Sequence, residues 1–169
     1  MKTTFSLISV ALLIGHVGVL ADESVVAKPG LTLDGAKRAA EAAAAFAKAN
    51  GASPSIAVVD EGGHLLYFTR SEEGFAAGAN VSIGKAHTAA IFKKPTGEFE
   101  EIINKGRFTM TALPDFTPLQ GGLPILHEGH VIGAIGVSGA KSAQQDEEVA
   151  KIGAAALSDS KALAKSEGK

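Results

Sequence analysis

Apolar residues repeat at helical spacing in four segments of the chain. These segments are 32–50, 80–93, 96–104 and 143–160. The first is rich in alanine, and Thr32 and Gly51 are typical of its N-terminal cap and C-terminal stop. Pro95 separates the second helix from the third, because proline cannot continue a helix. The pattern therefore predicts four helices, and the narrow alanine face of the first suits it to lie flat on a sheet.

Alternating apolar and β-branched residues predict two β-hairpins between these helices. The predicted strands are 55–60 and 64–70 in the first hairpin, and 123–127 and 130–137 in the second. Glu128-Gly129 is a typical two-residue turn for the second hairpin. If Gly62-Gly63 form the first turn, Glu61 faces His64 across it.

The order of elements is helix, hairpin, two helices, hairpin, helix, which predicts an α+β domain. Hairpins pair antiparallel, and helices before and after them cover the two faces of the resulting sheet. A four-stranded sheet keeps exposed edges, which favours association of several copies. Residues 105–120 contain glycine and proline without a sustained period, so they are predicted as a long loop of the kind that often carries function.

The first 21 residues are typical of a secretory signal peptide. Lys2 precedes an apolar run over residues 5–20, and Val19-Leu20-Ala21 ends it with small residues, so cleavage is predicted after Ala21. The run is too short for a lasting membrane span. This predicts a secreted or periplasmic protein with four parts. They are a signal peptide (1–21), a flexible leader (22–30), a single domain (31–160) and a polar tail (161–169).

Composition excludes several classes of function. The chain has no cysteine, which rules out disulfide bonds, thiol chemistry and thiolate-bound iron–sulfur clusters. Its net charge is −2 at pH 7, and no basic stripe is present to neutralise phosphates, so nucleic-acid binding is not expected. Gly133, Gly136 and Gly139 recur every third residue, but this is not the dinucleotide fingerprint, and close packing of a helix explains them more simply.

Three blocks of sequence together resemble the HbpS/GlcG family. They are Val58-Val59-Asp60-Glu61-Gly62-Gly63, Gly84-Lys85-Ala86-His87-Thr88-Ala89-Ala90, and the stretch 121–140 followed by Gln145-Asp146-Glu147. This family includes extracellular haem-binding proteins and the haem-binding C-terminal module of some corrinoid adenosyltransferases. The resemblance implies a profilin-like three-layer fold and homo-oligomers from dimers to octamers. It also implies a secreted haem- or iron-binding protein that acts in haem sequestration, haem breakdown or redox-stress sensing.

His87 is the first candidate for a haem ligand. It lies in the middle of a predicted helix, with Ile83, Ala90 and Ile91 on its face. Haem needs an apolar slot and an axial donor, and histidine is a common donor. The alternative is a buried histidine with a purely structural role. Met110 and Tyr67 are further candidates for the axial position.

Arg70 and Lys85 are the basic residues best placed to meet an acidic ligand, such as a haem propionate or a small organic acid. The alternative for both is an internal ion pair with Asp60, Glu61 or Asp146. Backbone N–H groups of Gly121-Gly122 form a candidate anion site, or these glycines only give the following strand a flexible start.

His127 and His130 flank the second turn and are predicted to face each other. Two imidazoles at this spacing are able to share a metal ion such as iron, and the alternative is a solvent-exposed hairpin tip. No catalytic residue is identified. Two other functions stay open, an enzyme that acts on a hydroxy- or keto-acid and a structural partner of an envelope sensor protein.

Overall fold

Two antiparallel hairpins meet at the centre of the molecule. They are formed by β1 (Ser55–Asp60) with β2 (Leu65–Arg70), and by β3 (Gly122–His127) with β4 (His130–Ser138). In this computed structural model, which describes residues 24–157, β1 pairs with β4 along its whole length and gives the order β2-β1-β4-β3. The two inner strands are consequently the most buried part of the sheet.

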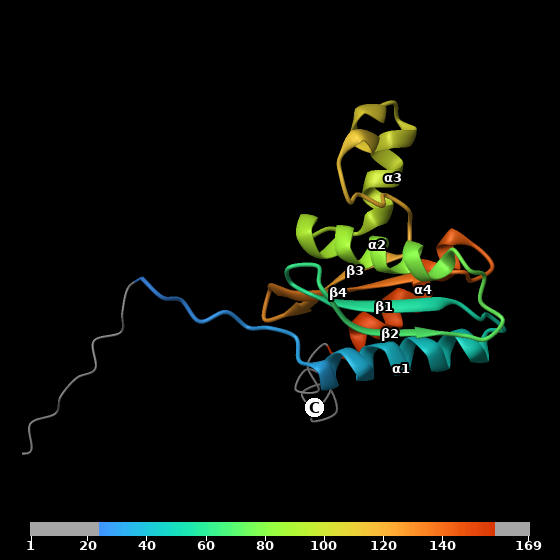
Figure 1. The fold of residues 1–169 in the computed structure, drawn as a ribbon, viewed down its shortest axis with the longest axis horizontal. Coiled ribbons are helices and arrows are strands. Elements are labelled where there is room, and N and C mark those ends of the chain that lie inside the picture. The colour runs from blue at the N-terminus through green and yellow to red at the C-terminus, as the bar shows by residue number, and fades with distance from the viewer. Residues whose placement is uncertain (1–23, 158–169) are drawn as a thin grey trace, which may run out of the picture.

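Helices cover both faces of this sheet, as Figure 1 shows. α1 (Leu33–Ala49) and α4 (Ala143–Ala155) pack on one face, and α2 (Gly78–Phe92) packs on the other. The β1 side chains divide accordingly. Ile56 and Val58 belong to the core under α1 and α4, whereas Ala57 and Val59 face the alanines of α2. The predicted α+β fold with three layers and a central antiparallel sheet of two hairpins is confirmed.

Close packing of α2 on β4 explains Gly136, the middle one of the three spaced glycines. A Cβ atom at Gly136 would overlap the carbonyl oxygen of Ser82 and the backbone of Ala86, both in α2. Small residues on both surfaces therefore let the helix backbone approach the strand backbone. Helix packing is therefore confirmed for Gly136 alone, because a Cβ atom at Gly133 would meet the Val59 carbonyl oxygen of β1, and Gly139 has a φ of +106° and lies against Phe75.

Most predicted element bounds are confirmed, with three corrections. Thr32 caps α1 by accepting a hydrogen bond from the Gly35 N–H at 3.1 Å, and α3 (Thr96–Asn104) has the predicted bounds. The last helix ends at Ala155 instead of near residue 160, and α2 begins two residues earlier than predicted. A short 3-10 helix, η1 (Phe108–Ala112), lies within the predicted loop.

The first hairpin departs from its predicted register. The Gly63 N–H donates to the Asp60 carbonyl at 3.1 Å, and the Asp60 N–H donates to the His64 carbonyl at 2.9 Å, so Asp60 and not Glu61 faces His64. A bulge follows, in which Val58 pairs with Tyr67 and Val59 pairs with Leu65. The turn therefore begins one residue earlier than expected and contains three residues, 61–63, instead of two.

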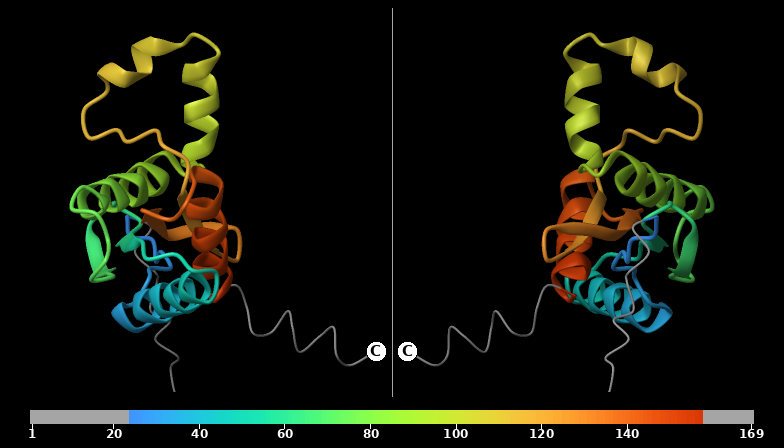
Figure 2. Two further views of the ribbon diagram at one scale, coloured as in Figure 1. Left: turned by 90° about the vertical axis from the view of Figure 1, so that its right-hand side faces the viewer. Right: turned by 90° about the vertical axis from the view of Figure 1, so that its left-hand side faces the viewer.

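Residues 96–120, called the arm below, project from the body of the molecule (Figures 1 and 2). At the base of the arm, the Thr96 hydroxyl donates to the Leu119 carbonyl at 2.5 Å and accepts from the Gly122 N–H at 2.8 Å. The rings of Phe92, Phe99 and Phe116 meet edge to face with centroids 5.2–5.3 Å apart. These contacts fasten both ends of the arm to α2 and β3.

Several predictions concern the two ends of the chain. The signal peptide and the polar tail lie outside the described residues. In the leader, residues 25–30 are exposed and have no regular secondary structure. Across residues 24–157, every helix is too short or too polar to cross a membrane.

Candidate functional site

His87 lies on α2 with its ring against the first hairpin. The Nδ1 atom is 3.1 Å from the carbonyl oxygen of Gly63. A carbonyl oxygen only accepts hydrogen bonds, so the proton of the neutral ring is on Nδ1. The Nε2 atom has no hydrogen bond to residues 24–157, and its lone pair is available to a ligand.

A pocket of ≈ 440 Å³ lies beside this ring, between α2 and the arm. This volume is within the range of small-molecule sites. Its lining residues are Gly63, Asn80, Ile83, Gly84, His87, Leu113, Asp115, Phe116 and Thr117. The apolar side chains come from both α2 and the arm, and four lining residues, Asn80, His87, Asp115 and Thr117, are polar or charged. The pocket therefore has a mixed lining in which the His87 imidazole is available to a ligand.

Specific contacts hold the arm wall of this pocket in place. The Thr117 N–H donates to the buried hydroxyl of Thr88 at 2.8 Å. Gly84 leaves room for the Thr117 side chain, which a Cβ atom at that position would overlap. Phe116 also packs against Phe92 near the end of α2. Residues 116 and 117 are thus placed by α2 itself.

The turn that carries Gly63 is organised by the Asp60 carboxylate. Its Oδ1 atom accepts hydrogen bonds from the Gly62 N–H at 2.9 Å and the His64 N–H at 2.8 Å, and lies 3.3 Å from His64 Nδ1. Burial works to raise the pKa of Asp60, but the hydrogen bonds from His64 and Gly62 and the charge on His64 outweigh it and lower the pKa below its usual value.

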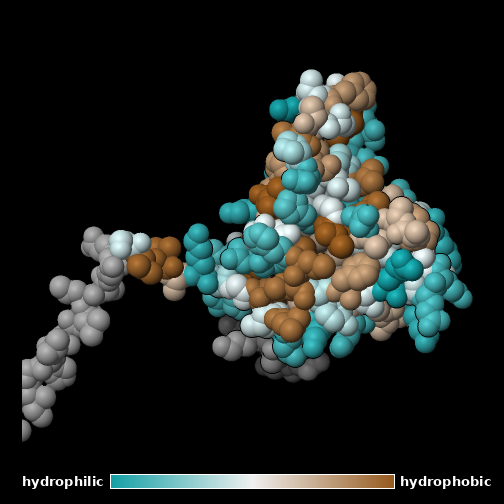
Figure 3. Space-filling view, in the orientation of Figure 1, coloured by the Kyte–Doolittle hydropathy of each residue, from teal (hydrophilic) through white to brown (hydrophobic). Residues whose placement is uncertain are grey.

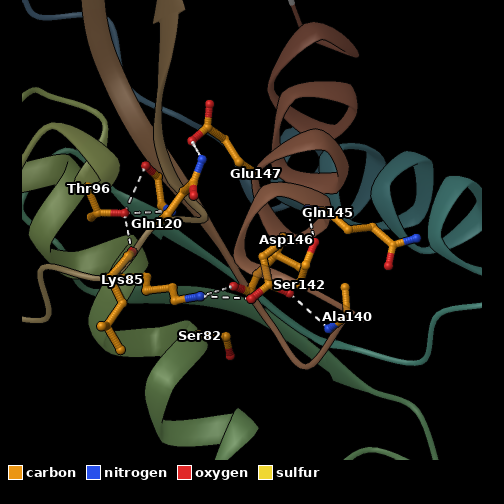
Figure 4. A network of polar contacts seen from close by, with 12 residues as sticks. Ser82, Lys85, Thr96, Gln120, Ala140, Ser142, Gln145, Asp146 and Glu147 are labelled. Carbon is orange, nitrogen blue, oxygen red and sulfur yellow. Dashed lines mark hydrogen bonds and ion pairs between the residues drawn. The ribbon is translucent and has the colours of Figure 1, made fainter. Parts of the chain in front are cut away.

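Lys85 forms a buried ion pair on the other side of α2. Its Nζ atom is 3.0 Å from Asp146 Oδ2 and 2.8 Å from the Val137 carbonyl oxygen, and the Ala140 N–H donates to Asp146 Oδ1 at 2.9 Å (Figure 4). The side chains of Lys85 and Asp146 are only 4% and 10% exposed. Of the alternatives left open for Lys85, the structure contains the ion pair with Asp146.

Gly121 and Gly122 are buried beside this pair. The Gly122 N–H is bound to Thr96, and the Gly121 carbonyl accepts from the Val137 N–H at 2.9 Å. A second pocket of ≈ 380 Å³ opens nearby and is lined by Lys85, Ser138, Ser142 and other residues. Lys85 thus belongs to this second pocket and is not among the residues that line the His87 pocket.

Arg70 lies away from both of these pockets. It is the last residue of β2 and pairs with Ser55, whereas Gly63 lies at the opposite end of that hairpin. Tyr67 packs toward α1 and α4, and Met110 lies in η1 without lining the His87 pocket. The structure therefore brings neither Arg70 nor Tyr67 to His87.

His127 and His130 pair directly across the second turn, which confirms their predicted register. Among residues 24–157, no group of three or more side chains of the metal-binding types is arranged to hold a metal ion. His127 also lines a separate cavity of ≈ 290 Å³ together with Arg38. Metal binding by the two histidines stays a prediction.

Sequence reasoning did not identify Asp60, Gly63, Asp115 or Thr117 as part of the His87 site. Asp60 and Gly63 had one usable signal, because an aspartate before two glycines is typical of a turn held by its own carboxylate. Asp115 and Thr117 lie in a segment without periodicity, and only the fold of the arm places them against α2.

Comparison with known proteins gives one family. The family model described as "Haem degrading protein HbpS-like" matches residues 31–155. Protein GlcG of Escherichia coli strain K12 is 45% identical over 92 residues, which cover 54% of this chain and 69% of GlcG. A double mutant of Streptomyces reticuli HbpS has a similar structure, with a TM-score of 0.76 and 31% identity over 90% of this chain and 98% of that chain. The structure of a PduOC–haem complex has a TM-score of 0.69 and 23% identity, over 76% of this chain and 95% of that one, and shows the fold alone.

Proposed function

The chain belongs to the HbpS-like family, and from this premise we propose that it binds haem in the pocket beside His87. The proposal rests on one hydrogen bond. Gly63 accepts the Nδ1 proton of His87, which leaves the Nε2 lone pair to act as an axial donor to iron.

The pocket residues fit such a ligand. Ile83, Leu113 and Phe116 offer apolar contacts to a macrocycle, and Gly63 and Gly84 have no side chains to obstruct it. Haem supplies redox-active iron when it is bound, and the protein holds and orients it through His87. Because the pocket lining includes no lysine or arginine, we expect the propionates to point toward solvent instead of toward Arg70 or Lys85.

Titration of the purified protein with haemin tests this proposal. We expect a Soret shift with the wild-type protein and a loss of affinity of roughly tenfold or more in His87→Ala. His130→Ala is the matched control, since His130 is an exposed imidazole on the second hairpin, and it should titrate like the wild type. A wild-type protein without a Soret shift, or a His87→Ala variant that binds normally, would overturn the proposal.

A second candidate function is recognition of a small hydroxy- or keto-acid beside Lys85. The observation that favours it is the second pocket, into which a buried ammonium with three N–H groups and two hydrogen-bond partners projects. Glu100 and Asp146 line the same pocket and oppose an anion, so we rank this function second. A melting-temperature screen with small organic acids separates the two functions, because a bound acid raises the melting temperature and inert acids do not.

We also propose that the protein is exported, assembles into homo-oligomers between dimer and octamer, and docks on an envelope sensor. Exposed apolar side chains support assembly, among them Leu65, Phe75 and Ile91, and Figure 3 shows apolar residues gathered on the side of the molecule where α2 and the edge strand β2 lie. Mass spectrometry of the protein from its own cells should give a chain that begins at residue 22, and light scattering should give an oligomer.

The same preparation tests by metal analysis whether His127 and His130 bind iron, and by pigment analysis whether bound haem is broken down.

A further inference from the structure

We propose that Asp60 is a positioning residue for His87. Its carboxylate holds the turn whose Gly63 carbonyl selects the protonated nitrogen of the His87 ring. The importance of this arrangement for ligand binding rests on the proposed function, whereas the arrangement itself is a property of the protein without ligand.

Asp60 fixes the shape of the turn in the first hairpin. Asp60 Oδ1 binds the N–H groups of Gly62 and His64, which are the residues on either side of Gly63. The main chain of Asp60 also binds the Gly63 N–H and the His64 carbonyl. Both peptide units that flank Gly63 are therefore held by one residue.

The space between Gly63 and the His87 ring is narrow. Its φ is +82°, a conformation that favours glycine, and a Cβ atom there would overlap Nδ1 of His87. With no side chain in between, the Gly63 carbonyl oxygen lies 3.1 Å from that nitrogen. The direction of this carbonyl group thus depends on the turn that Asp60 holds.

The Gly63 carbonyl decides which nitrogen of the His87 ring carries the proton. A neutral imidazole carries one proton, and its position is set by the hydrogen bond of one nitrogen. While Gly63 accepts from Nδ1, the lone pair of Nε2 is free for a ligand. If the turn relaxes, the proton is able to move to Nε2 and the ring to rotate. Asp60 therefore acts on the ligand only through His87.

The positioning role connects two separated blocks of the sequence. The block 58–63 provides the carboxylate and the carbonyl, and the block 84–90 provides the imidazole, 24 residues from Gly63. A residue that stabilised the hairpin without fixing the Gly63 carbonyl would have no reason to affect the tautomer of His87.

Nuclear magnetic resonance of the protein without haem tests the inference directly. At about pH 8, above the ordinary pKa of imidazole, ¹⁵N and ¹³C shifts distinguish the two neutral tautomers. We expect the Nδ1–H form of His87 in the wild type and in Asp60→Asn, since the amide oxygen still accepts from both N–H groups. Asp60→Ala should shift the population toward Nε2–H, and Asp34→Ala, a loss of an exposed carboxylate on α1, should have no effect.

Two results would overturn the inference. One is a folded Asp60→Ala variant with wild-type His87 shifts, and the other is an Nε2–H tautomer in the wild-type protein, which needs no variant to fold. Haemin affinity gives a second readout, with a loss of about 10- to 100-fold in Asp60→Ala and recovery in Asp60→Asn. If the tautomer responds but wild-type protein does not bind haemin, the proposed function fails and the positioning role stands.

Discussion

The pair of Lys85 and Asp146 is the most buried ionic contact among the described residues. Lys85→Met should destabilise the protein by about 3–5 kcal/mol, because it leaves the Asp146 carboxylate buried without its cation. Urea unfolding measures this loss. Adding Asp146→Leu should recover part of it, since the uncompensated charge is then removed.

Lys105→Met is the matched control for that experiment. Lys105 pairs with Glu101 on the surface at 3.3 Å, and both side chains are more than 70% exposed. Exposed pairs contribute little, so the expected change is within about 0.5 kcal/mol. Equal losses in the two lysine variants would contradict the view that burial decides the strength of the Lys85 pair.

Asp60 should also make stability depend on pH. Its pKa is lower in the folded protein than the usual 3.8, so its stabilising contribution is present above pH 3.8 and is lost as the pH falls through the lowered value. The melting temperature of the wild type should therefore be higher than that of Asp60→Asn at neutral pH. The difference between the two melting temperatures should disappear only in this acid range. An advantage that stays constant across the range would contradict the assignment.

At the residue scale, sequence reasoning identified side chains better than their partners. His87 was chosen as a candidate because an imidazole in an apolar helix face is conspicuous, and the ion pair of Lys85 with Asp146 was one of the alternatives considered. Asp60 and Gly63 were missed as parts of the site because the turn was predicted with two residues, 62–63, instead of three, 61–63. The hydrogen bonds of a carboxylate, which decide that turn, are not visible in hydrophobic periodicity.

Among elements, α2 packs so closely on β4 that no side chain fits between the two backbones at Gly136. Gly136→Ala should cost about 1–3 kcal/mol, because its Cβ would meet rigid backbone atoms of Ser82 and Ala86 instead of a flexible side chain. Gly30→Ala is the matched control, with no atom nearer than 3.9 Å to the added carbon and an expected change within about 0.5 kcal/mol. Chemical denaturation of both variants checks this, and a neutral Gly136→Ala would show that α2 moves away freely.

The elements with strong local signals were predicted correctly from the sequence. The cap at Thr32 and the proline before α3 are chemical signals within a few residues, and both helices begin where expected. The bulge in the first hairpin has no such signal. It places Leu66 and Tyr67, which are adjacent in sequence, against the same core and breaks the simple alternation that sequence reasoning assumes.

Across the whole molecule, stability should be divided between the sheet and the arm. The arm is held at its base by three phenylalanine rings, whereas the inner strands are buried on both faces. Phe116→Ala removes two edge-to-face pairs and should cost about 1–3 kcal/mol. Hydrogen exchange should then become faster in residues 96–120 and remain slow in β1 and β4.

Phe108→Ala is the control for the arm. Phe108 is 66% exposed in η1 and has no ring contact within the described part of the chain. Its removal should leave exchange in the arm close to the wild-type rate. If Phe108→Ala loosens the arm as much as Phe116→Ala, the aromatic cluster is not what fastens it.

The hydrogen bonds of Thr96 bring the two ends of the arm together, and this has a consequence for the length of the chain. Closing a loop costs conformational entropy that grows only with the logarithm of the number of residues. Extra residues at the arm tip, around Gly106, would therefore add little to that cost, because the base is closed by Thr96 and the ring cluster. A guest peptide or a small folded domain inserted at this position should leave the sheet, the first hairpin and the wall formed by residues 113–117 in place. The tip is thus a suitable attachment point for an affinity tag or a fluorescent reporter of ligand binding.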